Sequence, residues 1–108
     1  MAPVTQMTPA ELKALMDQGS TYCLLDVREP WEVAIAAIRG SVYIPLNEIP
    51  GRLQELDAGQ AVIVMCKAGG RSQRVADYLA ARGFAQVSNL QGGIDAWSRD
   101  IEPDLPAY

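Results

Sequence analysis

The segment from Ala61 to Met65 places the strongest constraint on the fold of this 108-residue chain. Its sequence, Ala-Val-Ile-Val-Met, is apolar on both faces of an extended strand and β-branched in the middle. A strand of this kind is typical of the centre of a parallel sheet, because both of its faces have to be covered by helices. We therefore expect an α/β fold in which strands alternate with helices.

Shorter apolar runs and helical spacing extend this alternation along the chain. The predicted strands cover residues 22–27, 41–44, 61–65 and 84–90, and the predicted helices cover residues 9–19, 30–38, 72–82 and about 93–97. The first helix has a clear start, because Thr8 can be its N-cap, Pro9 suits the first helical position and Glu11 can close a capping box. Residues 47–56 also have helical spacing, but a proline and a glycine inside them predict a short or irregular helix.

Length, apolar content and charge limit the classes of protein that fit. We expect one domain over residues 1–108, since 49% apolar residues suffice for a core without metal or disulfide support. No apolar run approaches the roughly 20 residues of a membrane helix, so we expect no membrane span. The first residues lack the basic start and apolar run of a secretion signal, which favours a cytoplasmic protein. A net charge of -4 argues against nucleic acid or an anionic membrane as partner.

The chain contains no histidine, and this restricts its chemistry. Catalytic triads with histidine, cysteine–histidine pairs and histidine-ligated zinc are excluded. The two cysteines, Cys23 and Cys66, are too few for an all-cysteine metal site or a disulfide framework. We therefore expect neither a metal nor another cofactor, and each cysteine has to be considered alone.

The segment after the predicted central strand carries the candidate chemistry. It reads Cys66-Lys67-Ala68-Gly69-Gly70-Arg71-Ser72 and leads into a helix. Ligands of open parallel sheets bind beyond the carboxyl ends of the strands. The two glycines let successive N–H groups point inward as an anion nest, with the positive end of the helix behind them. A thiol at the base of this nest would be stabilised as a thiolate, so Cys66 is the candidate nucleophile.

Charged residues near this loop divide into two groups. Lys67, Arg71 and Arg74 oppose the dipole of the helix that they begin, and such a cluster favours an anionic ligand. Asp26 and Arg28, after an earlier strand, are better interpreted as structural residues that satisfy loop backbone or pair below the site than as a catalytic pair. The second thiol, Cys23, lies inside an apolar strand without a neighbouring cation, so we interpret it as a small core residue.

Four separated segments carry a resemblance to one family: residues 24–29 (Leu-Leu-Asp-Val-Arg-Glu), 40–45 (Gly-Ser-Val-Tyr-Ile-Pro), 66–72 and 90–97 (Leu-Gln-Gly-Gly-Ile-Asp-Ala-Trp). Together they resemble the rhodanese superfamily over about residues 6–98, and residues 99–108 are then a C-terminal tail. The resemblance implies a rhodanese-like three-layer α/β fold with a central parallel sheet of about five strands and helices on both faces.

The resemblance also implies an activity. In rhodaneses the loop cysteine takes a sulfane sulfur from a donor such as thiosulfate, holds it as a persulfide and passes it to cyanide or another thiophilic acceptor. By position, Cys66 would be this nucleophile. The loop backbone would cradle the outer sulfur, through Lys67, Ala68, Gly69, Gly70, Arg71 and Ser72. The side chains of Lys67 and Arg71 would attract the anionic donor.

Three points stay open at the level of sequence. Residues 36–40 read Ala-Ala-Ile-Arg-Gly, where the family has Gly-His-Ile-Pro-Gly; we interpret them as a connection without a chemical role, in which Arg39 adds a cation. A carrier that moves a persulfide sulfur between protein partners would share all of these residues. A small cysteine phosphatase is a weaker alternative, because the four residues between Cys66 and Arg71 make a tight cradle that suits one sulfur atom.

Overall fold

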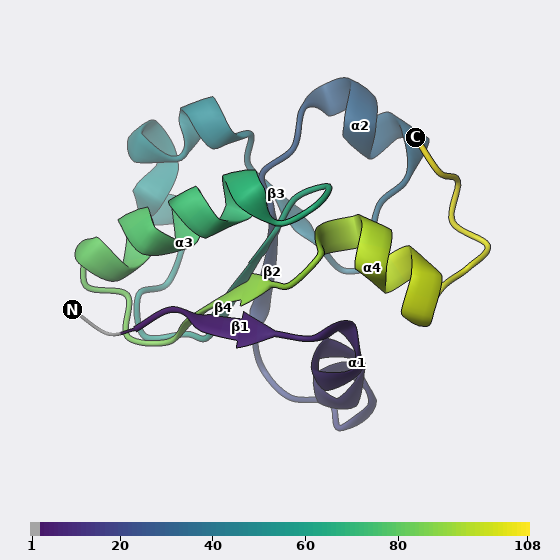
Figure 1. The fold of residues 1–108 in the computed structure, drawn as a ribbon. Helices are drawn as coiled ribbons and strands as arrows, with labels where there is room; N and C mark the ends of the chain where they lie inside the picture. Colours follow the sequence, from purple (N-terminus) through teal and green to yellow (C-terminus); the bar gives the residue numbers. More distant parts are fainter. Residues whose placement is uncertain (1–2) are drawn as a thin grey trace.

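A computed structural model describes residues 3–108 and contains strands and helices that alternate along the chain (Figure 1). The strands are β1 (Thr5–Met7), β2 (Cys23–Asp26), β3 (Val42–Tyr43), β4 (Val62–Met65) and β5 (Val87–Leu90). The helices are α1 (Pro9–Asp17), α2 (Pro30–Ile35), the 3-10 helices η1 (Leu46–Glu48) and η2 (Pro50–Glu55), α3 (Gly70–Ala81) and α4 (Gly93–Asp100). The domain start that we predict at residue 1 lies outside the described residues. Within residues 3–108, no helix is long and apolar enough to cross a membrane.

The five strands form one parallel sheet in the order β1-β5-β4-β2-β3. Helices α1 and α4 pack on one face, and α3 with the two 3-10 helices packs on the other (Figure 1). The expected three-layer α/β fold and its five-stranded parallel sheet are confirmed.

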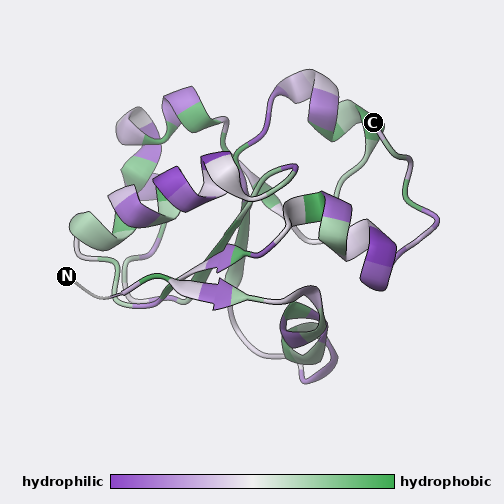
Figure 2. Ribbon diagram, in the orientation of Figure 1, coloured by the Kyte–Doolittle hydropathy of each residue, from purple (hydrophilic) through white to green (hydrophobic). Residues whose placement is uncertain are grey.

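Successive residues of the central strand β4 face opposite layers. Val62 and Val64 join the core under α3, whereas Ile63 and Met65 join the core under α1 and α4. All four side chains are buried, and each buried side chain of this size contributes about 1.5–3 kcal/mol. Figure 2 shows hydrophobic colour along the central strands and hydrophilic residues on the edge strand β1. The apolar run that predicts a central parallel strand therefore lies in the middle of the sheet.

The direction of the chain across the sheet reverses between β4 and β2. The chain passes from β4 through α3 to β5 on one side, and from β2 through α2 to β3 on the other. The loops that follow β4 and β2 therefore diverge at the carboxyl ends of the strands. Such a reversal is where ligands bind in open α/β sheets. Residues 66–69 and 27–29 form the two loops.

Several elements differ from the prediction in their presence or their bounds. Strand β1 has no counterpart in the predicted elements, because it is only three residues long and largely exposed. Helix α2 ends at Ile35 rather than near residue 38, since the chain becomes extended at Ala36, whose carbonyl oxygen accepts a hydrogen bond from Arg28. Helix α3 begins at Gly70, two residues before the predicted start, and β5 begins at Val87, three residues after its predicted start. Helix α4 continues to Asp100, so the first two residues of the predicted tail are helical.

Candidate active site

Cys66 directly follows the central strand β4 and lies at the base of the loop that leads into α3. Its side chain is 1% exposed. The Cys66 Sγ atom accepts hydrogen bonds from the backbone N–H groups of Gly69 at 3.1 Å and Ser72 at 3.4 Å, and it lies 3.2 Å from Ser72 Oγ. Amide groups at the amino end of α3 thus converge on the sulfur.

Gly69 makes the turn that brings these amide groups together. It is the N-cap of α3 and has a φ of 111°, a backbone conformation that residues other than glycine rarely adopt. Its N–H donates to Cys66 Sγ, and its carbonyl oxygen accepts from the Asn89 side chain at 3.3 Å. A loop of this shape presents N–H groups to the sulfur and keeps the carbonyl group turned away from it.

Helix α4 holds the outer side of the same loop. The N–H of Ile94 donates to the Cys66 carbonyl oxygen at 2.9 Å, and the N–H of Asp95 donates to the Lys67 carbonyl oxygen at 3.1 Å. A Cβ atom on Gly93 would lie 2.5 Å from the Cys66 carbonyl oxygen, so the close approach of α4 requires glycine there. The glycine pair at the start of α4, with Gly92 as N-cap and Gly93 as first residue, therefore lets the helix pack against the cysteine loop, which is distant in the sequence.

The two cysteines differ in acidity for physical reasons. Burial raises the pKa of the Cys66 thiol, but the hydrogen bonds from Ser72, Gly69 and Ala68 outweigh burial, and the net pKa lies below the usual thiol value. Cys23 is half-buried against the apolar core, and burial alone raises the pKa of its thiol. Of the two thiols, Cys66 is therefore the one set up to react as a thiolate.

Lys67 and Arg71 both contact carboxylates beside the loop. Lys67 Nζ lies 3.0 Å from Asp95 Oδ2, and both side chains are partly exposed. The Arg71 guanidinium makes a bidentate pair with Glu32 on α2, through hydrogen bonds of 2.6 and 2.9 Å. This pair lowers the pKa of the Glu32 carboxyl to about 2, against the opposing effect of burial. The charges of these two cations are thus locally balanced.

Tyr108 joins the charged groups at the rim. Its hydroxyl accepts a hydrogen bond from Arg28 at 2.9 Å and donates one to Glu32 at 2.7 Å. Its ring centroid lies 5.0 Å from Lys67 Nζ and 5.7 Å from the ring centroid of Trp31, which meets it edge-on. The predicted tail therefore returns to α2 and the site, as the position of the C-terminus in Figure 1 shows.

Asp26 and Arg28 form a buried ion pair at the carboxyl end of β2. Arg28 Nη2 lies 2.7 Å from Asp26 Oδ2, and the two side chains are at most 1% exposed. The same guanidinium donates to the Ala36 carbonyl oxygen at 2.7 Å and to Tyr108. The pair thereby connects β2, the end of α2 and the C-terminal segment below the rim of the site.

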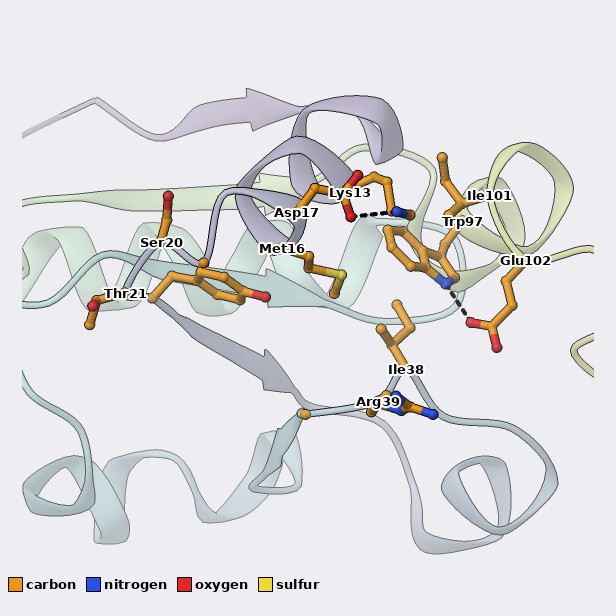
Figure 3. A pocket seen from close by; sticks show the side chains of 13 residues that line it. Lys13, Met16, Asp17, Ser20, Thr21, Ile38, Arg39, Trp97, Ile101 and Glu102 are labelled. Carbon is orange, nitrogen blue, oxygen red and sulfur yellow. Dashed lines mark hydrogen bonds and ion pairs between the residues drawn. The ribbon is translucent and has the colours of Figure 1, made fainter.

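The remaining predicted cations lie away from the sulfur. Arg39 lines a hollow of about 680 Å³ together with residues of α1 and the end of α4, among them Met16, Trp97 and Glu102 (Figure 3). Tyr22 and Gly40, which precede β2 and β3, also line this hollow, so it opens at the amino ends of the strands and Cys66 lies at the opposite ends. Arg74 lines a smaller apolar hollow between α3 and the 3-10 helices.

Four residues at the site are missing from the sequence prediction: Glu32, Asn89, Asp95 and Tyr108. All four approach the loop from other elements and are distant from it in the sequence. Asp95 lies inside one of the segments that resemble rhodaneses, so that segment is the signal that could have drawn attention to it. The other three carry no recognisable pattern.

The chain is similar to known proteins over most of its length. The family model for the rhodanese-like domain matches residues 8–100. A protein of Allochromatium vinosum named sulfurtransferase is 38% identical over 96 residues, which cover 89% of this chain and 90% of that protein. The crystal structure of a rhodanese-like domain protein from Staphylococcus aureus matches with a TM-score of 0.82 at 31% identity, and covers 87% of this chain and 91% of that one.

Longer relatives are also similar. The Zea mays protein named adenylyltransferase and sulfurtransferase MOCS3-1 is 38% identical over 110 residues, which are 95% of this chain but 24% of that protein. The chain thus spans about a quarter of the length of this relative.

Proposed function

Since the chain belongs to the rhodanese-like domain family, we propose that it is a sulfurtransferase in which Cys66 carries a sulfane sulfur as a persulfide. The observation that carries this proposal is the convergence of the Gly69 and Ser72 N–H groups on Cys66 Sγ. A nest of this kind stabilises a thiolate without histidine, which the chain lacks.

The proposed reaction has two half-reactions at one atom. The Cys66 thiolate attacks the outer sulfur of a donor such as thiosulfate, a new sulfur–sulfur bond forms, and sulfite leaves with the electron pair of the old bond. An acceptor such as cyanide then attacks the outer sulfur of the persulfide, leaves as thiocyanate and restores the thiolate. The backbone from Lys67 to Ser72 would hold the outer sulfur in fixed directions during both steps.

A second candidate is a persulfide carrier that acts between protein partners. The pairing of Lys67 with Asp95 and of Arg71 with Glu32 favours it, because paired cations attract a dianion such as thiosulfate less than free cations do. Relatives that combine adenylyltransferase and sulfurtransferase in their names contain this domain as one part of a longer chain, which is compatible with a protein donor or acceptor. A phosphatase is less supported, since only four residues separate Cys66 from Arg71 and a loop of this length makes a tight cradle that suits one sulfur atom.

Steady-state thiocyanate formation from thiosulfate and cyanide tests the proposal. We expect Cys66→Ala to abolish turnover, whereas Cys23→Ala should leave it nearly intact, because the Cys23 thiol lies outside the loop and burial raises its pKa. A second arm replaces thiosulfate with a low-molecular-weight persulfide. Turnover with the persulfide but not with thiosulfate would favour the carrier. Loss of turnover in Cys23→Ala but not in Cys66→Ala would refute the choice of nucleophile.

A further inference from the structure

A polar network lies behind the cysteine loop, on the side of β5 and β1. Its centre is the side chain of Asn89 on β5, which is 4% exposed. The two hydrogens of Asn89 Nδ2 are shared among three acceptors: the Gly69 carbonyl oxygen at 3.3 Å and the side-chain oxygens of Gln6 and Gln73 at 3.1 and 3.2 Å. Asn89 Oδ1 accepts from Ser72 Oγ at 2.5 Å. Asn89 thus contacts Gly69 and Ser72, whose N–H groups both donate to the Cys66 sulfur.

The orientation of the Asn89 amide is fixed by its backbone partner. A carbonyl oxygen can only accept a hydrogen bond, so the Gly69 contact requires the NH2 group of Asn89 on that side. The amide oxygen of Asn89 then faces Ser72, and an amide oxygen also can only accept. The single hydrogen of the Ser72 hydroxyl is therefore directed to Asn89.

This assignment determines the direction of the contact between Ser72 and Cys66. The two side chains lie 3.2 Å apart, and either atom could donate by geometry alone. Because the Ser72 hydroxyl donates to Asn89, Ser72 Oγ is the acceptor in its contact with Cys66, and the Cys66 thiol is the donor. This arrangement fits a protonated Cys66, which can donate to Ser72 Oγ. A thiolate has no hydrogen to donate, so the Ser72 hydroxyl would have to donate to it.

We propose that Asn89 is a positioning residue that competes with the Cys66 sulfur for the Ser72 hydroxyl hydrogen. While Cys66 is a thiol, the Ser72 hydroxyl donates its hydrogen bond to Asn89 Oδ1. When Cys66 becomes a thiolate, the hydroxyl rotates and donates to Sγ instead. Each deprotonation of Cys66 then breaks the hydrogen bond between Ser72 and Asn89. The loss of this hydrogen bond offsets part of the stabilisation that the loop gives the thiolate. Persulfide formation moves the negative charge to the outer sulfur, so the Ser72 hydroxyl can again donate to Asn89 Oδ1. This role in sulfur transfer rests on the proposed function.

Other charged groups around Cys66 do not supply this effect. Arg71 on α3 favours the thiolate through its charge, whether or not Asn89 is present. Asp26 on β2 is paired with Arg28, Glu32 on α2 is paired with Arg71, and Lys67 is paired with Asp95 on α4. Among residues 3–108, Ser72 is the side chain that hydrogen-bonds to Cys66 Sγ, and Asn89 accepts from the Ser72 hydroxyl, so the competition acts through these two residues.

The test is the rate of alkylation of Cys66 by iodoacetamide, measured in a Cys23→Ala background so that one thiol remains. The pH is set below the midpoint at which the thiolate forms, where the rate follows the thiolate fraction. We expect Asn89→Ala to increase the rate about two- to tenfold, as the release of one hydrogen bond implies. Asn89→Leu, which refills the space of the side chain, should act in the same direction and guards against a folding defect in Asn89→Ala.

Ser72→Ala is the control that separates this competition from the contact of Asn89 with Gly69. When Ser72→Ala is combined with either Asn89 variant, the increase should disappear, because no hydroxyl hydrogen remains to be released. An increase of the same size without the hydroxyl, or a decrease on removal of Asn89, would overturn the proposal. Alkylation needs no sulfur donor, so its result is independent of whether the chain transfers sulfur.

Discussion

Substitution of Gly93 by alanine is the sharpest test of how the cysteine loop is held. Gly93 begins α4, has a φ of 58° and lies against the backbone of the loop. An added Cβ atom would lie 2.5 Å from the Cys66 carbonyl oxygen and closer still to that of Lys67. These neighbours are backbone atoms and cannot rotate away as a side chain can. We expect the loop and the start of α4 to move apart.

Two costs combine at this position. The left-handed conformation costs alanine about 1–2 kcal/mol, and a clash in a packed region costs about 1–3 kcal/mol. The sum of about 2–5 kcal/mol is a large part of the roughly 5–15 kcal/mol that stabilises a domain of this kind. Movement of the loop would also turn the N–H groups of Gly69 and Ser72 away from the sulfur, so the reactivity of Cys66 should fall together with stability.

Gly19→Ala is the matched control, because Gly19 has a φ of 67° and no atom within 4 Å of its added Cβ. It carries the conformational cost without the clash. Urea unfolding of both variants gives the free energy of unfolding. In thermal unfolding, each kcal/mol of lost stability should lower Tm by about 4–8 °C. We expect Gly93→Ala to be less stable than Gly19→Ala by about 1–3 kcal/mol and to alkylate more slowly at Cys66. Equal stability and equal reactivity of the two variants would refute the structural role of Gly93.

Two further predictions concern the ion pairs at the rim. The pKa of Glu32 lies at about 2 instead of 4.5, so its pair with Arg71 stabilises the fold fully above about pH 4.5, and this stabilisation disappears as the pH falls toward 2. In urea unfolding, the free energy of unfolding of the parent should fall by about 1–3 kcal/mol more than that of Glu32→Gln across this pH range. This range allows for solvent screening, because Arg71 is one-third exposed. The same pH dependence of stability in both proteins would contradict the prediction. Asp95→Asn should free Lys67 and raise kcat/KM for thiosulfate up to about fivefold at low salt, with a smaller gain at high salt. A salt-independent change, or a decrease, would show that Lys67 does not attract the donor.

The sequence predicts those parts of the fold that a local pattern specifies. The apolar run in β4, the capping box of α1 and the glycine turn before α3 each act over a few neighbouring residues. Strand β1 has only three residues and is stabilised by pairing with β5, so its own sequence does not reveal it. The early end of α2 depends on a hydrogen bond from Arg28, which is likewise a tertiary contact.

The same distinction applies to the site. Cys66 and its loop are contiguous in the sequence, so the order of a cysteine, two glycines and a helix is enough to predict a stabilised thiolate. The partners of Lys67 and Arg71 come from α4 and α2, and no spacing rule connects them to the loop. The sequence therefore predicts cations at the site but cannot predict that carboxylates balance them. The hydrogen bond between Asn89 and Ser72 is missed for the same reason, because it joins β5 to α3.

The most direct test of the proposed function is the intact mass of the protein after exposure to a sulfur donor, followed by mapping of the modified peptide. Thiosulfate and a low-molecular-weight persulfide are supplied separately, and cyanide is then added. We expect the mass of one sulfur atom to appear on Cys66, to be lost on addition of cyanide and to be absent from Cys66→Ala. Sulfur bound at Cys23, or no added sulfur with either donor, would contradict the proposed role of Cys66.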